Sequence, residues 1–148
     1  QATKGKRIAL LVDIAYLDFA GDAEKCRQFM KKFSNLPANM IVMLSVSMSK
    51  SFTLYGQRTG AIIGISSDKE AIDEFKVAMD VTSRGTWSNI NRSAMQILAT
   101  INEEKALFDA VEKERAEFKE LIEKRSAIFV VVSSLVFLPL IQQQLWIS

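Results

Sequence analysis

Apolar residues form two kinds of pattern in the first third of the chain. Two short, continuous apolar runs, Ile8 to Tyr16 and Met40 to Met48, are typical of strands that are buried on both faces of a sheet. Between these runs, Asp22 can cap a helix over 23–33, in which apolar residues recur at helical spacing. The order strand, helix, strand predicts that the two strands are parallel and joined by a right-handed crossover.

The rest of the chain up to residue 126 contains one further strand pattern and several helix patterns. The expected elements are a strand over 59–65, a helix from Asp68 through 79, an irregular polar stretch over 82–91, a short apolar helix over 93–101 and a long amphipathic helix over 103–126. These patterns predict an α/β fold, in which a mainly parallel sheet is flanked by helices and followed by the long helix.

The last segment, 127–148, differs in character from everything before it. Its first part, 127–141, is almost entirely apolar, but it is shorter than the roughly 20 residues of a membrane-spanning helix, and Pro139 interrupts it. Its β-branched residues make a strand as plausible as a helix. We therefore expect no membrane span, and attachment to a membrane through this segment is only a subordinate alternative.

Composition and charge exclude several classes of function. The 148 residues suit one domain, and the net charge of +2 gives no reason to expect a nucleic-acid partner. The sequence has no histidine, which removes Ser-His-Asp and Cys-His catalysis and most zinc sites, so we expect no metal site. Cys26 is the only cysteine and cannot form an intrachain disulfide, which favours a reducing, cytoplasmic location.

Polar side chains with possible chemistry follow the first two predicted strands. They are Asp13 and Tyr16 after the first strand, and Ser47, Ser49 and Lys50 after the second. Open parallel sheets bind ligands at the edge where the carboxyl ends of the strands meet. A carboxylate, a phenol and an amine at one edge suit a pyridine cofactor, and the hydroxyls with the planar fork of Arg58 suit a phosphate group.

Each of these residues also has an ordinary structural interpretation. Taken singly, Asp13 is more often a residue of a turn, Lys50 a surface lysine and Arg58 one half of an ion pair. The spacing of the residues alone leaves the cofactor site and the ordinary polar loop as open alternatives.

Three segments, in this order, resemble a known enzyme family. DIAY, at 13–16, resembles a D-x-A-Y motif, and SRGTWSNINRSA, at 83–94, resembles an R-x-x-[YW]-S-N segment. The longest match is SMSKSFTLYGQRTGA, at 47–61, which resembles the signature S-x-S-K-[NS]-F-x-L-Y-x-[EQ]-R-x-G-A. The family is the class I, fold-type I aminotransferases that depend on pyridoxal 5'-phosphate (PLP), with the aspartate and aromatic amino acid enzymes as the most similar group. The resemblance covers about residues 7–129.

The resemblance implies a catalytic role for three residues. Lys50 would form a Schiff base with PLP and carry the proton between the substrate α-carbon and the cofactor. Asp13 would pair with the pyridinium nitrogen. Tyr16 would hydrogen-bond the phenolic oxygen of the cofactor and lower the pKa of the Schiff base.

The resemblance also implies residues for the phosphate and for the substrates. Ser47, Ser49 and Arg58 would hold the cofactor phosphate. The substrates would be an amino acid, aspartate or an aromatic one, and a 2-oxo acid. Arg84 would bind the distal carboxylate of the substrate across a dimer interface, so a homo-oligomer is expected.

Members of this family are much longer than 148 residues, and the resemblance implies only a part of their fold. We expect a partial PLP-binding large domain over 1–102, a linking helix over 103–126 and a tail over 127–148 that does not resemble the family. Whether this chain alone completes an active site is therefore open. Two hypotheses follow, namely an aminotransferase that works through Lys50 and a catalytically inactive, truncated remnant that folds and self-associates.

Overall fold

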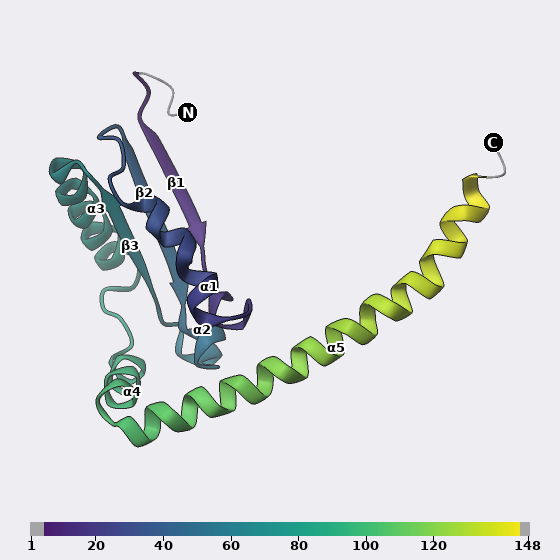
Figure 1. The fold of residues 1–148 in the computed structure, drawn as a ribbon. Helices are drawn as coiled ribbons and strands as arrows, with labels where there is room; N and C mark the ends of the chain where they lie inside the picture. The colour runs from purple at the N-terminus through teal and green to yellow at the C-terminus, as the bar shows by residue number, and fades with distance from the viewer. Residues whose placement is uncertain (1–4, 146–148) are drawn as a thin grey trace. The chain divides into compact units, whose positions relative to one another are not determined.

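The computed structural model of the protein describes the backbone of residues 5–145 and the side chains of residues 5–133. The chain divides into two compact units, Gln1–Glu104 and Lys105–Ser148. The first unit contains a sheet and the helices around it, and the second is one long helix (Figure 1). All of the residues predicted to form a site belong to the first unit.

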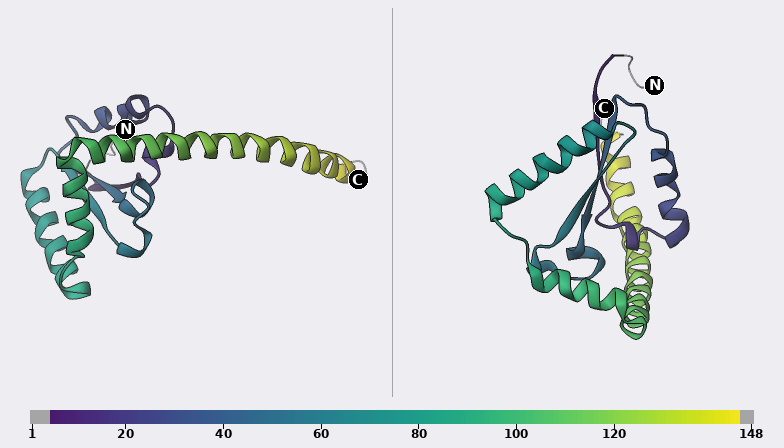
Figure 2. Two further views of the ribbon diagram at one scale, coloured as in Figure 1. Left: turned by 90° about the horizontal axis from the view of Figure 1, so that it is seen from below. Right: turned by 90° about the vertical axis from the view of Figure 1, so that its left-hand side faces the viewer.

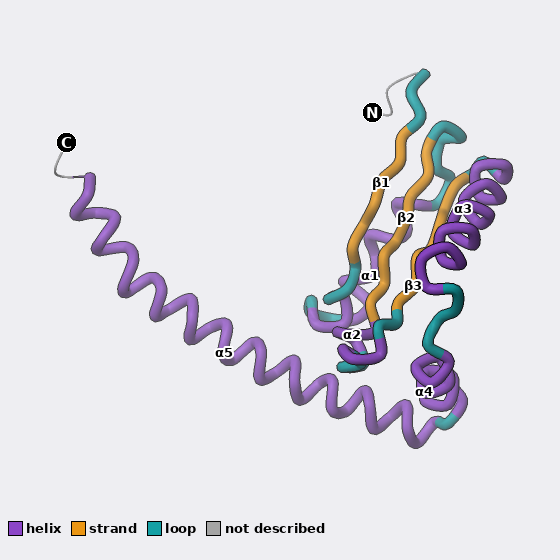
Figure 3. The backbone as a smooth tube through the Cα atoms, turned by 180° about the vertical axis from the view of Figure 1, so that it is seen from behind, coloured by secondary structure: helices purple, strands orange, loops and turns teal. Residues whose placement is uncertain are grey.

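The sheet has three strands, β1 (Ile8–Asp13), β2 (Met40–Ser47) and β3 (Gly60–Ser66), and β2 lies in the middle (Figure 3). β1 and β2 are parallel, which confirms their predicted pairing. β3 runs antiparallel to β2, so the sheet is mixed rather than mainly parallel. The physical reason is the short connection over 48–59, which stays at one edge of the sheet and returns the chain beside β2, whereas a parallel strand needs a longer crossover.

The connection between β1 and β2 contains the predicted helix in two parts. After η1 (Leu17–Phe19), the helix begins as α1 (Ala23–Arg27) and continues as the 3-10 helix η2 (Gln28–Phe33). The carboxylate of Asp22 accepts a hydrogen bond from the backbone N–H of Lys25 at 2.9 Å, which confirms the predicted cap.

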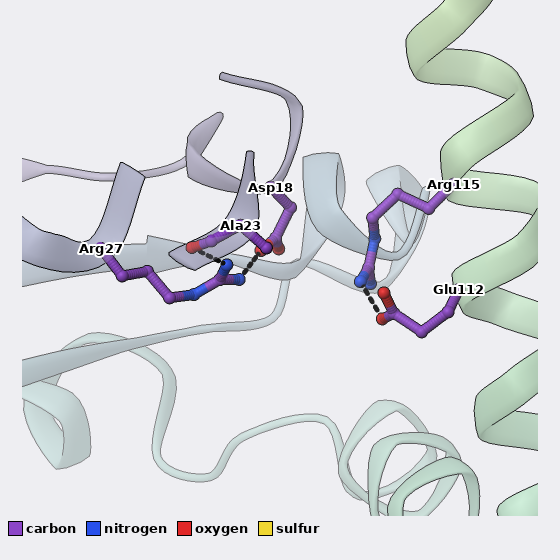
Figure 4. Close-up of polar contacts among 5 residues, drawn as sticks. All are labelled: Asp18, Ala23, Arg27, Glu112 and Arg115. Carbon is purple, nitrogen blue, oxygen red and sulfur yellow. Dashed lines mark hydrogen bonds and ion pairs between the residues drawn. The ribbon is translucent and has the colours of Figure 1, made fainter. Parts of the chain in front are cut away.

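The Arg27 side chain links two segments of this connection. Arg27 donates from Nη1 to the carbonyl oxygen of Ala23 at 2.8 Å, and its Nη2 forms an ion pair with Asp18 (Figure 4). The 3-10 segment before α1 is thereby linked to the helix that follows it.

The helix after β3 is longer than the sequence pattern predicts. α3 (Lys69–Trp87) is capped by Asp68, whose carboxylate accepts a hydrogen bond from the backbone N–H of Glu70 at 3.0 Å. The prediction that residues 82–91 are irregular is wrong for their first half. Threonine side chains there bond back along the helix, Thr82 to the carbonyl oxygen of Ala78 at 2.7 Å and Thr86 to that of Thr82 at 2.6 Å. The hydroxyl groups of these threonines are hydrogen-bonded within the helix, so the polar residues here do not indicate a loop.

Helices lie on both sides of the sheet, with α1 and η2 on one side and α3 on the other (Figure 2). α3 approaches β3 closely at Gly64, where an added Cβ would lie 2.8 Å from Cδ1 of Phe75. The absence of a side chain at Gly64 therefore lets the Phe75 ring pack against the sheet.

The buried part of the sheet is small. Val42 and Leu44, on the central strand, are 0% and 4% exposed. In contrast, Leu11 on β1 and Val77 and Val81 on α3 are more than half exposed, at 61%, 64% and 65%. The first unit therefore carries apolar surface along an edge strand and along the outer side of α3.

α4 (Arg92–Glu103) closes the first unit, and the second unit is α5 (Lys105–Leu145). Ion pairs one turn apart stabilise α5, among them Lys105 with Asp109, Arg115 with Glu112 (Figure 4) and Lys124 with Glu120.

The helix continues without a break from 126 into 127–145, so the structure has a helix where the sequence left helix and strand open; residues 146–148 lie outside the described part. Within the described residues, no helix is both long and apolar enough to cross a membrane.

Candidate functional site

The carboxyl ends of β1 and β2 lie side by side, because the two strands are parallel and Asp13 is the register partner of Ser45. Residues in register on parallel strands share a face, and so do residues two positions apart on one strand. Asp13, Ser45 and Ser47 therefore belong to one face of the sheet at its end. The Asp13 carboxylate is exposed and accepts a hydrogen bond from the backbone N–H of Ala15 at 2.9 Å.

The Lys50 amine lies between two aromatic rings at this edge of the sheet. Lys50 belongs to the short helix α2 (Met48–Ser51), which follows β2 at the end where β1 also terminates (Figure 1). Its Nζ is 5.3 Å from the centroid of the Tyr16 ring and 4.4 Å from that of the Tyr55 ring. Tyr16 comes from the loop after β1 and Tyr55 from the 3-10 helix η3 (Tyr55–Gln57), so three separate elements meet at this amine.

The two tyrosines favour the charged form of Lys50. A hydrogen bond to the Tyr16 side chain is the largest cause that raises the pKa of Lys50, and interaction with Tyr55 adds to it. Partial desolvation acts in the opposite direction and is outweighed. A lysine that is poised as a nucleophile has a lowered pKa, so the free Lys50 amine in this arrangement is held as an ammonium ion.

A second polar contact joins α2 to the turn that follows it. Ser49 is only 6% exposed, and its Oγ lies 3.4 Å from Nη1 of Arg58. The same nitrogen donates to the carbonyl oxygen of Tyr55 at 3.0 Å. Arg58 has a left-handed backbone (φ 50°), which ends η3 and leads the chain into β3. The guanidinium and the serine hydroxyl thus form a contact that could bind an anion beside Lys50.

The turn is fastened to α4 by Asn91, a residue that sequence reasoning missed. The side-chain amide of Asn91 donates to the carbonyl oxygen of Gln57 at 3.1 Å and to its Oε1 at 2.6 Å. The Asn91 Oδ1 accepts from the backbone N–H groups of Ser93 and Ala94 at the start of α4. The N-cap position before 93–101 was the only sequence signal for this residue, and it gives no hint of a contact 34 residues away.

The predicted site residues are therefore not all brought together. Tyr16 and Lys50 are in contact, and so are Ser49 and Arg58, whereas Ser47 ends β2 without a capping hydrogen bond. Arg84 lies on α3, where its Nε is 3.4 Å from Asp80 of the same helix.

A cavity of about 460 Å³ opens beside the end of β1 and is lined by Asp13 and Tyr16 together with Cys26 and Phe29, from the α1 side. No group of three or more histidine, cysteine or acidic residues in the described part of the chain is arranged to hold a metal ion.

The family model for "Aminotransferase class I and II" matches residues 1–133. The chain belongs to this family. The aspartate aminotransferase of Escherichia coli (strain K12) is 30% identical over 120 residues, which are 81% of this chain and 30% of that enzyme. The resemblance inferred from the three motifs is thereby confirmed.

Solved aminotransferase structures have the same fold over this part. An aminotransferase from Anaerococcus prevotii matches with a TM-score of 0.82 and 43% identity, covering 87% of this chain and 31% of its own. An aromatic-amino-acid aminotransferase from Burkholderia pseudomallei, covalently bound to pyridoxal phosphate, matches with a TM-score of 0.67 and 29% identity over 78% of this chain and 29% of its own. The chain thus spans about a third of the length of these relatives.

Proposed function

We propose that this aminotransferase-family chain carries the PLP-binding part of an enzyme of the aspartate and aromatic amino acid group, and that Lys50 is the residue that bonds the cofactor. The observation that carries the proposal is the position of the Lys50 amine, beside Tyr16 at the carboxyl edge of two parallel strands. Ligands of open α/β sheets bind at this edge.

The residues around Lys50 fit the two ends of PLP. Arg58 and the Ser49 hydroxyl, already in contact at 3.4 Å, offer charge and hydrogen bonds to the phosphate, with Ser47 as a further hydroxyl at the end of β2. The exposed carboxylate of Asp13 would hold a proton on the ring nitrogen. When bound, PLP supplies an electron sink for the bonds at the α-carbon of an amino acid.

The proposed substrates are an amino acid, aspartate or an aromatic one, and a 2-oxo acid. The Lys50 amine would take and return the proton at the α-carbon, and the Tyr16 phenol beside it would orient that amine by their hydrogen bond. Arg84 would bind a distal substrate carboxylate in the site of a second subunit. Its side chain is 75% exposed and contacts Asp80 on its own helix, which is compatible with a role at another surface.

A second candidate function is a non-catalytic, self-associating protein that keeps the cofactor residues as relics. The exposure of the site favours it, because Tyr16 and Tyr55 are 62% and 53% exposed. Water around the reacting groups weakens the electrostatic stabilisation on which catalysis depends, and misplacing a substrate by about 1 Å can cost on the order of a hundredfold in rate.

The two functions are separated by assaying attachment and turnover on the same preparation of the 148-residue chain. We expect PLP to attach to the protein, seen as visible absorbance that disappears on borohydride reduction while the cofactor becomes irreversibly linked to the chain. We expect transfer of the amino group from aspartate or phenylalanine to 2-oxoglutarate to remain near the background of free PLP. Sustained turnover well above that background would exclude the non-catalytic alternative, and no attachment at all would contradict the PLP-binding proposal.

We also propose that the protein is a homo-oligomer. Within residues 5–145, both outer strands of the sheet have one unpaired edge, and Leu11, Val77 and Val81 expose apolar side chains on the same unit. We expect sedimentation velocity at micromolar concentration to give a dimer or a larger species. Replacing Val77 and Val81 together by serine should shift the distribution towards monomer if α3 contributes to the contact. A wild-type protein that sediments as a monomer would contradict the proposal.

A further inference from the structure

Tyr55 contacts both cationic side chains of the proposed PLP site, Lys50 and Arg58. The face of its ring lies 4.4 Å from Nζ of Lys50, which is closer than the Tyr16 ring. Its carbonyl oxygen accepts a hydrogen bond from Nη1 of Arg58 at 3.0 Å. Lys50, five residues before Tyr55, and Arg58, three residues after it, are thus each contacted by a different part of one tyrosine.

The charges around Lys50 explain why such a contact is needed. Lys50 meets the Tyr16 phenol from the loop after β1 and the Tyr55 ring from η3. Arg58, on the same turn, adds a like charge, and the nearest acid of β1, Asp13, has a hydrogen bond to the backbone of Ala15. The negative face of an aromatic ring attracts an ammonium ion, so Tyr55 can partly replace a carboxylate as the partner of Lys50.

The backbone of Tyr55 is well fixed. It begins η3, whose last residue, Gln57, is bonded twice by the side chain of Asn91 from the start of α4. The ring therefore projects from a turn that is anchored at its other end, although the ring itself is 53% exposed.

We propose that Tyr55 is a positioning residue for Lys50, and that the face of its ring holds the ammonium group at the carboxyl edge of the sheet, beside the Arg58 group. Before Lys50 bonds an aldehyde, its Nζ must leave this ring face and release a proton to the solvent. This inference deepens the proposed function because it concerns the same lysine, but its test needs no PLP.

The test measures the protonation of Lys50 directly. Lysines of the full chain are dimethylated with ¹³C-formaldehyde, and the Lys50 signal, assigned by its loss in Lys50→Arg, is followed by NMR as a function of pH. Because the ring favours the charged form, we expect Tyr55→Leu to lower the pH midpoint of Lys50. Tyr55→Phe keeps the ring face and is expected to retain most of the wild-type midpoint.

Two controls make the comparison specific. Trp87→Leu removes an aromatic ring of similar exposure, 61%, at the end of α3 and should leave the Lys50 midpoint unchanged. Tyr55→Met, with an unbranched side chain, repeats the measurement if leucine disturbs η3, and the amide spectrum checks the fold of each variant.

Two results would overturn the proposal. An unchanged midpoint in folded Tyr55→Leu and Tyr55→Met would show that the ring does not act on Lys50. An equal fall in Tyr55→Phe and Tyr55→Leu would assign the effect to the phenol hydroxyl instead of the ring. A failure of PLP to attach to Lys50 would contradict the proposed function but would not change this measurement.

Discussion

Lys50→Ala is expected to abolish the borohydride-reducible attachment of PLP at the turn after β2. The variant removes the one amine that lies between Tyr16 and Tyr55 at the carboxyl edge of the sheet. Lys50 has two aromatic rings beside its amine and the Ser49–Arg58 contact on the neighbouring turn, so it should react at a lower PLP concentration than an ordinary surface lysine. The measurement is reduction at low PLP concentration, followed by mass spectrometry of the peptide that contains residue 50.

A matched lysine serves as the control for this experiment. Lys69 is the first residue of α3 and follows the carboxyl end of β3. Because β3 is antiparallel to β2, this end lies at the opposite edge of the sheet from Lys50. The Lys69 amine forms an ion pair with Asp73. PLP should label residue 50 of the Lys69→Ala variant to the same extent as in the wild type. Equal labelling of many lysines in the wild type, with no preference for Lys50, would contradict a specific site.

The same reaction should depend on pH in a definite direction. The Tyr16 hydrogen bond raises the pKa of Lys50, so the ammonium form persists to higher pH than for an ordinary lysine. Only the unprotonated amine can attack an aldehyde, so attachment should become faster as the pH rises towards the pKa of Lys50.

Arg58→Ala is expected to weaken PLP binding by about tenfold to a hundredfold, because hydrogen bonds to charged groups contribute about 1.5–3 kcal/mol each. The Arg58 guanidinium contacts the buried Ser49 hydroxyl and is the cation nearest to Lys50 on the same turn. The dissociation constant follows from titrating the visible absorbance. Pyridoxal, which lacks the phosphate, should bind the variant and the wild type with the same affinity.

Two further arginine variants sharpen this result. Arg58→Lys keeps the charge but loses the planar fork, so it should recover only part of the affinity. Arg7→Ala removes the same charge at the amino end of β1, at the opposite edge of the sheet, and should bind PLP as the wild type does. A loss of pyridoxal affinity equal to the loss of PLP affinity would show that Arg58 maintains the turn and does not bind the phosphate.

The sequence by itself determined most of the local elements and the sheet edge at which the proposed site residues Asp13 and Lys50 lie. Apolar runs marked β1 and β2 as strands, but the expectation that both faces are buried is wrong for β1, where Leu11 is 61% exposed. Asp22 and Asp68 marked two helix starts, because a carboxylate satisfies the free N–H groups of the first turn in any context. Parallel strands then required Asp13 and Lys50 to lie at the same edge.

Contacts between distant segments were decided only by the tertiary structure. The direction of β3 depended on how the turn over 48–59 packs, and the length of α3 depended on hydrogen bonds that polar residues such as Thr86 make within the helix. The Tyr55 ring on Lys50 and the Asn91 amide on Gln57 could not be read from spacing. Periodicity reports which face a residue occupies within its own element, whereas these contacts depend on how separate elements approach one another in space.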